Sequence, residues 1–297
     1  MFAYDFMRTA FLASGIVALL SGLVGYFLVL RNQTFAGHAL SHVGFTGATG
    51  AILIGVPPLW GLVGFTLLAG LGMGALGEKL SARDVAIGMT LSLALGFGLL
   101  FLHFYTAFAT QATALLFGNV LGVDRSALAS LAALAAFSVA ALAFISRPLL
   151  FASLQPELAE ARGLPMRLLS TAFLGIVAVA VSESAQIVGV LLVFTLMVGP
   201  GAASRNFTPR FGVGVALAAA LAVAEAWGGL VLAWVTDWPV SFWITALSAA
   251  VYGASLAALP SAALARAPFR RRAGAGSASR PAARDHRDGG ARVNPET

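Results

Sequence analysis

The sequence predicts an all-α membrane protein, a polytopic bundle of about eight or nine transmembrane helices. Of its 297 residues, 59% are hydrophobic and only 10% are charged, whereas a soluble domain carries about 25% charged residues. The mean hydropathy is +0.89. Several apolar stretches also reach the roughly 20 residues that an α-helix needs to cross a bilayer.

Apolar runs predict nine helices along the chain. The first run, from Thr9 to Leu30, is longer than the apolar core of a signal peptide, about 7–15 residues, and no cleavage site follows it. We therefore interpret it as a membrane helix. The nine predicted helices cover residues 9–30, 36–56, 58–77, 85–105, 127–146, 168–182, 186–203, 211–235 and 239–263.

Arginine-rich loops predict the orientation of these helices. Segment 147–167 carries three arginines and is too polar to cross the membrane, so the positive-inside rule places it in the cytoplasm. The polar run SESAQ, residues 182–186, predicts an outer turn near Glu183. Counting back from a cytoplasmic C-terminus gives nine crossings and an external N-terminus. Residues 106–126 bear on this parity, since they form either a loop or a segment that dips into the membrane, and eight crossings are the alternative.

The basic charge of the chain belongs to its C-terminal tail. Residues 266–297 hold eight arginines against three acidic residues, whereas the rest of the chain is almost neutral. We expect a transmembrane domain over residues 1–265 and a disordered cytoplasmic tail over residues 266–297. Such a tail suits lipid headgroups or solvent, and we expect no nucleic-acid partner.

Several enzyme classes are excluded by missing residues. His38 and His42 have the spacing of a zinc-protease helix, but Ala39 stands where the general base Glu is required. The only lysine, Lys79, follows Glu78 and lies in no phosphate-binding loop. No cysteine is available as a metal ligand. We therefore expect no enzymatic activity and no tightly bound cofactor in this chain.

Ionisable side chains within a membrane span are costly and often functional. His38, His42 and Glu225 are the candidates for transient contact with a metal ion, and two imidazoles bind more weakly than a closed zinc site. The alternative is that each forms a structural hydrogen bond with a neighbouring helix. We place His103 and Glu183 near the membrane interfaces.

Four segments, in this order, resemble the ABC-3 metal permease family, the membrane subunits of ABC importers for zinc, manganese and iron. The resemblance runs from about residue 8 to residue 260. The segments are LRNQTFAGHALSHVGFTG (30–47), LLFGNVLGVDRSAL (115–128), LQPELAEARGLP (154–165) and IVGVLLVFTLMVGPGAASR (187–205).

The resemblance implies a fold related to cobalamin and siderophore permeases, in the plasma (inner) membrane of a bacterium. It implies a second permease copy in a homodimer, a cytoplasmic ATP-binding subunit that binds the ATP, and a periplasmic or surface solute-binding protein. The transported cargo would be a divalent transition metal ion. The alternatives are a permease of the same architecture for a metal chelate or another small solute, and a membrane-embedded metal-dependent enzyme.

The resemblance also implies roles for single residues. His42 keeps the family's histidine, whereas His38 stands where the family has Asp. Because imidazole suits zinc better than a carboxylate does, zinc is favoured, then manganese or iron. Segment 154–165 would couple the chain to the ATP-binding subunit, and within it Pro156 and Gly163 predict the start and the end of a short helix. The implied coupling residues are Pro156, Glu157, Ala161 and Gly163, and the implied helix-packing residues are Gly37, Gly47, Gly189 and Pro200.

Overall fold

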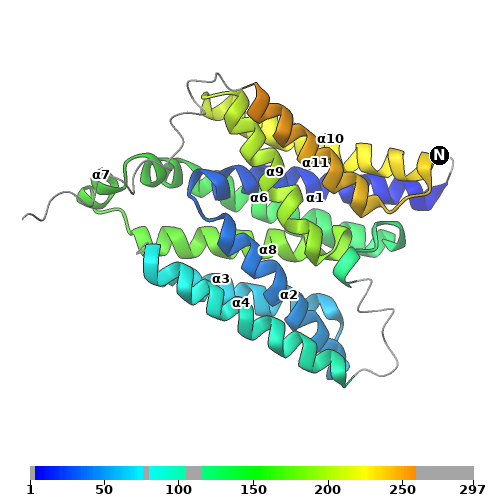
Figure 1. Ribbon diagram of the computed structural model, residues 1–297. Helices are drawn as coiled ribbons and strands as arrows, with labels where there is room; N and C mark the ends of the chain where they lie inside the picture. The colour runs from blue at the N-terminus through cyan, green and yellow to red at the C-terminus, as the bar shows by residue number, and fades with distance from the viewer. Residues whose placement is uncertain (1–3, 76–79, 105–114, 259–297) are drawn as a thin grey trace, which may run out of the picture. The chain divides into compact units, whose positions relative to one another are not determined.

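The computed structural model describes residues 4–75, 80–104 and 115–258, and these are almost entirely helical, with no strand among them (Figure 1). Residues up to Ala258 form one unit. The predicted tail, residues 266–297, and its boundary lie outside the described residues.

All nine predicted helices are present, and the all-α fold is confirmed. Two short elements join them: the 3-10 turn η1 (Val120–Gly122) and helix α7 (Pro156–Ala161). The long helices are α1 (Asp5–Leu30), α2 (Thr34–Leu53), α3 (Pro58–Ala75), α4 (Leu80–His103), α6 (Arg125–Leu154), α8 (Met166–Val188), α9 (Val190–Phe207), α10 (Phe211–Thr236) and α11 (Val240–Ala257).

Eight of the described helices are long and apolar enough to cross a membrane. Among the long helices the exception is α2, which has 20 residues but contains His, Ser, Thr and Gly residues that lower its hydropathy. Figure 1 shows α1 beginning at the end of the bundle opposite α7. We call the end where α1 begins the outer end, following the predicted orientation, in which α7 is cytoplasmic.

Helices α1 and α8 are the most buried of the candidate spans, and α4 and α11 the least. α1 packs against α9 and α10, while α3 packs between α2 and α8. The central bundle is thus built on α1 and α8.

The predicted outer turn at Glu183 is wrong. Residues 182–186 are helical, and Glu183 is completely buried within α8. Ser182 and Ser184 donate hydrogen bonds to the carbonyls of Ala178 and Ala180 on their own helix, at 2.8 and 2.7 Å. Because these hydroxyls are satisfied locally, the polar run does not interrupt the helix.

The predicted end of the fifth long helix at residue 146 is also wrong, since α6 continues through Pro148 to Leu154. Proline lacks the backbone N–H and loses one helical hydrogen bond. Leu149 and Ala152 are buried just beyond it, and the Arg31 guanidinium donates to Ser153 Oγ at 3.3 Å. These contacts hold the last turns of α6 against α1.

Candidate functional site

The two histidines of α2 lie against each other and against α9. The ring centroids of His38 and His42 are 4.8 Å apart with an interplanar angle of 85°. The His38 ring also meets the Phe194 ring of α9 at 5.1 Å. Both imidazoles are half-buried. Nδ1 of His38 is buried and has no hydrogen-bond partner among the described residues, so the pair retains unused ligand capacity.

Hydroxyl groups and glycines hold α2 in place. Ser41 donates to the His38 carbonyl at 2.7 Å, and Thr46 donates to the His42 carbonyl at 3.3 Å and to the Ala94 carbonyl of α4. Gly47 packs directly on the Gly61 carbonyl of α3, where a Cβ atom would overlap the backbone. The backbone that carries the imidazoles is thus fixed to two neighbouring helices.

Gly37 is buried beside the Leu28 side chain, and a Cβ atom there would lie 3.1 Å from Leu28 Cδ1. That contact involves a flexible side chain and is less strict than the contact at Gly47. Pro200 is buried within α9, and the helix continues through it.

Glu225 does not join the histidine pair. It lies in α10, is 2% exposed, and neither carboxyl oxygen has a hydrogen-bond partner among the described residues. Ser248 of α11 lies beside this carboxyl and donates to the Thr195 carbonyl of α9 at 3.4 Å. α9 therefore contacts His38 through Phe194 and the surroundings of Glu225 through Thr195.

No three His, Asp or Glu side chains gather into a metal-binding group within the described residues. A closed structural zinc site needs about four ligands and a catalytic one about three. Among the described residues, the arrangement therefore brings two imidazoles together and adds no third acidic or histidine side chain to them.

Helix α7 forms as the sequence predicts, at the end of the bundle opposite the N-terminus (Figure 1). Pro156 occupies its first turn, and Gly163 follows its end with φ of +76°. The N–H of Leu164 donates to the Ala159 carbonyl at 3.1 Å, which closes the helix in the manner of a glycine C-cap. Glu157 and Ala161 are exposed, and Ala159 is buried.

At the outer end, two of the four segments of the resemblance meet backbone to backbone. Gly189 joins α8 to α9 with φ of +91°, and Gly118 has φ of +80°. Each glycine packs so closely on the backbone of the other segment that a Cβ atom on either would overlap it. The turn between α8 and α9 is thus a single glycine, held under residues 116–118.

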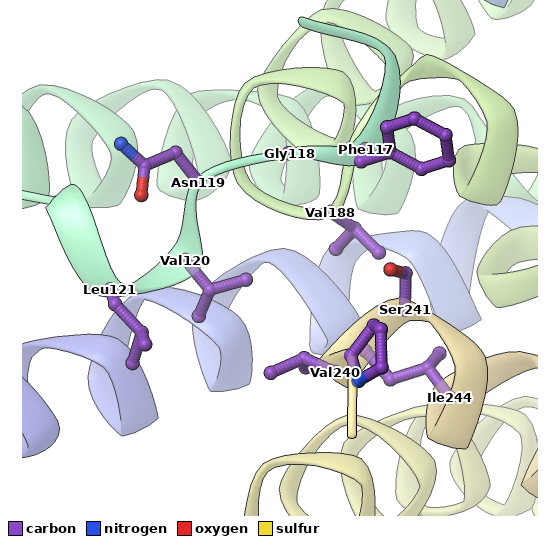
Figure 2. Close-up of a pocket in the computed structure, with 10 residues that line it drawn as sticks. Phe117, Gly118, Asn119, Val120, Leu121, Val188, Val240, Ser241 and Ile244 are labelled. Atoms are coloured by element: carbon purple, nitrogen blue, oxygen red, sulfur yellow. The ribbon is translucent and has the colours of Figure 1, made fainter. Parts of the chain in front are cut away.

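Beside this contact lies a pocket with a volume of about 250 Å³, drawn in Figure 2. Residues 117–121 form one wall, and Val188 and the start of α11 form the other. Its lining includes no acidic, histidine or cysteine side chain. We assign no metal-binding role to it.

Sequence reasoning underestimated Glu183, because its polar neighbours suggested a turn. The sequence signal for Glu183 is the pair of serines on either side of it, Ser182 and Ser184. In the structure these two serines bond to α3 and α1, respectively. His103 ends α4 and is exposed, as expected for a residue near an interface.

Comparisons with known proteins agree with this architecture. The model of the ABC 3 transport family matches residues 3–258. The manganese transport system membrane protein MntC of Halalkalibacterium halodurans is 27% identical over 236 residues, 79% of this chain and 81% of that protein. The probable iron transport system membrane protein of Haemophilus influenzae is 30% identical over 257 residues, 86% of this chain and 94% of that protein.

The fold is also that of a solved structure, PsaBC from Streptococcus pneumoniae in complex with Fab. The TM-score is 0.77 at 22% identity, and the alignment covers 86% of this chain and 93% of that chain. The helices of the present chain therefore form a multi-pass membrane protein of known architecture.

Proposed function

Because the chain belongs to the ABC 3 transport family, we propose that it is the permease of an ATP-driven importer of divalent transition metal ions. The observation that carries this proposal is the half-buried pair His38 and His42, whose rings lie together on a membrane helix with an unpartnered nitrogen. Manganese and iron in the names of the relatives support the same cargo class.

A site of two imidazoles suits an ion in transit better than a permanently bound ion. An ion in a conduction path must bind strongly enough to enter and weakly enough to leave. Both rings are half-buried, so part of each imidazole stays accessible to an ion from outside the chain. We propose a homodimer in which the metal path runs between the two permeases.

Zinc is the first candidate cargo from the imidazole chemistry alone, followed by manganese or iron. The solute-binding protein, which would deliver the ion at the outer end, would make most of the selection. The names of the relatives favour manganese and iron, so the proposal is a cargo class rather than one metal.

ATP hydrolysis would come from a separate cytoplasmic subunit, since the sequence has no phosphate-binding loop. Helix α7 suits the contact with that subunit. It projects Glu157 and Ala161 into solvent, while the Arg162 guanidinium lies 5.6 Å from the Phe151 ring centroid and ties the loop to α6. A movement of α7 would thus be transmitted to a membrane helix.

The test is uptake of radioactive zinc and manganese into vesicles that contain this chain with its ATP-binding and solute-binding subunits. We expect ATP-dependent uptake by the wild type and a loss of about tenfold or more in the His38→Ala/His42→Ala double variant, because both ligands are removed. His103→Ala is the matched control, since this exposed histidine ends α4, and it should transport normally. Wild-type uptake of both metals by the double variant would contradict the proposal, as would a wild type that accumulates neither.

A further inference from the structure

Glu183 is the least explained side chain of the bundle. Its exposed fraction is 0%, and neither carboxyl oxygen has a hydrogen-bond partner among the described residues. Buried polar groups are nearly always hydrogen-bonded, and each exception requires an explanation. An unpaired carboxylate inside a membrane protein costs several kcal/mol, roughly, unless a proton or a cation joins it.

Its position is fixed from both sides. Ser182 Oγ lies 2.6 Å from Thr66 Oγ1 of α3, and Ser184 Oγ lies 2.8 Å from Ser21 Oγ of α1. Successive residues of an α-helix are about 100° apart around its axis. The Glu183 side chain therefore leaves α8 between these two contacts, where α1 and α3 flank it.

A pocket reaches the next turn of α8 towards the outer end, although Glu183 itself does not line it. It has a volume of about 760 Å³ and lies between the α2–α3 turn, residues 115–119 and α8. Gln186, one helical turn from Glu183 on the same side of α8, lines it together with Asn119 and Leu62. The Leu62 carbonyl accepts hydrogen bonds from Thr66 at 2.7 Å and from Ser182 at 3.5 Å. Polar groups thus continue from the pocket to the turn that carries Glu183.

The polar side chains described above offer oxygen ligands. They are the carboxylate of Glu183, the hydroxyls on either side of it, and the side-chain carbonyls of Asn119 and Gln186 in the pocket lining. Oxygen ligands suit hard cations such as manganese, whereas the imidazoles of α2 suit zinc. The two groups of ligands therefore differ in the ions that they favour.

We propose that Glu183 is a second cation-binding residue, reached from the outer end through this pocket, and that its oxygen surroundings favour manganese over zinc. This inference rests on the proposed metal transport and names a cargo preference within it. Glu183 would supply the negative charge, and Gln186 and Asn119 would replace part of the water around the entering ion.

Manganese binding to the purified full-length chain tests the inference directly. The paramagnetic resonance signal of free manganese reports the bound fraction, and the His38→Ala/His42→Ala variant removes the contribution of the imidazoles. In that background, Glu183→Gln should weaken manganese binding by about tenfold or more, because the only charged ligand is lost. Glu160→Gln is the matched control, since it removes an exposed carboxyl of α7 at the opposite end of the bundle, and it should leave binding unchanged. Equal binding with and without Glu183 would overturn the inference and leave Glu183 a neutral structural group.

A second measurement does not depend on the folding of a Glu183 variant. The chain has no cysteine, so Val56→Cys creates a single thiol in the pocket lining for a membrane-impermeant maleimide and removes none of the proposed ligands. We expect labelling from the outer side that manganese slows at least about threefold, since the bound ion occupies the pocket. Trp238→Cys, exposed at the α10–α11 turn, should be labelled equally with and without manganese. Labelling of Val56→Cys that is insensitive to manganese would overturn the inference.

Uptake by the wild type separates this inference from the proposed function. If the reconstituted wild type accumulates no metal, the proposed function fails. If it accumulates metal but Glu183→Gln binds manganese normally, only the role of Glu183 fails.

Discussion

The histidine pair of α2 and the carboxyl of Glu183 on α8 are both polar groups in a membrane-spanning bundle, yet they are held in opposite ways. The imidazoles are half-buried and touch each other and Phe194. Glu183 is fully enclosed, and the residues before and after it bond to different helices. The first group is partly exposed, whereas the second is enclosed within the bundle.

The helices that carry these groups both meet α3 at glycines, but only α8 adds hydroxyl pairs beside its polar group. α2 approaches α3 at Gly47, and α8 approaches it at Gly70 and Gly74, in each case backbone on backbone. The hydroxyl pairs of α8 flank Glu183, and an interhelical hydrogen bond in a membrane is worth about 0.6 kcal/mol on average. A glycine contact should therefore contribute more to the position of a helix than a hydroxyl pair does.

The largest effect is expected at Gly47. Gly47→Val should destabilise the protein by about 3 kcal/mol, because the new side chain must push α2 away from the Gly61 carbonyl. Thermal unfolding in detergent measures this as a lower midpoint. Gly64→Val on α3 is the matched control, since an added Cβ there has no atom within 4 Å. Equal loss of stability in the two variants would contradict the assigned contact.

A smaller and different effect is expected at α7, which is remote from both polar groups. Gly163→Val should reduce metal uptake several-fold while ATP hydrolysis continues, because a left-handed residue with a side chain costs about 1–2 kcal/mol and displaces the end of α7. Uptake and ATP hydrolysis are measured on the same vesicles. Manganese and zinc binding by the isolated chain should not change.

Glu157→Lys should act in the same direction, because it reverses the charge of an exposed residue on α7. Gly72→Val in α3, where an added Cβ has open space, is the control for a general effect of valine. Full coupling in both Gly163→Val and Glu157→Lys would remove α7 from the proposed contact with the ATP-binding subunit.

The smallest effect is expected at the hydroxyl pairs of α8. Ser184→Ala should lower the free energy of unfolding by about 0.6 kcal/mol, since it removes the single bond to Ser21. A double-mutant cycle with Ser21→Ala isolates the interaction energy of the pair. A coupling near zero would mean that packing alone positions the turn of α8 that carries Glu183.

Much of the fold could be predicted from the sequence, because length and hydropathy decide which segments cross a membrane. All nine long helices follow from apolar runs, and α7 follows from Pro156 and Gly163. Polar residues in α8 were misread as a turn, since their hydroxyls bond within the helix and to α1 and α3. The real turn is Gly189 alone, which only its positive φ identifies.

The site was predictable in part. The spacing of His38 and His42 placed both imidazoles on one face of a helix, and the structure brings their rings together. The sequence could not reveal that Glu225 lies apart from the two histidines, because that depends on how α2 and α10 each pack against α9. Nor could it reveal the enclosure of Glu183, which depends on contacts between helices far apart in the sequence.

X-ray absorption of the zinc-loaded chain tests the central claim, that the α2 histidines contact the transported ion. We predict nitrogen ligands at about 2.0–2.1 Å from the zinc, with the multiple scattering typical of imidazole. This signal should disappear in the His38→Ala/His42→Ala variant and persist in Glu183→Gln. A zinc spectrum that is the same in the wild type and the double variant would contradict the account.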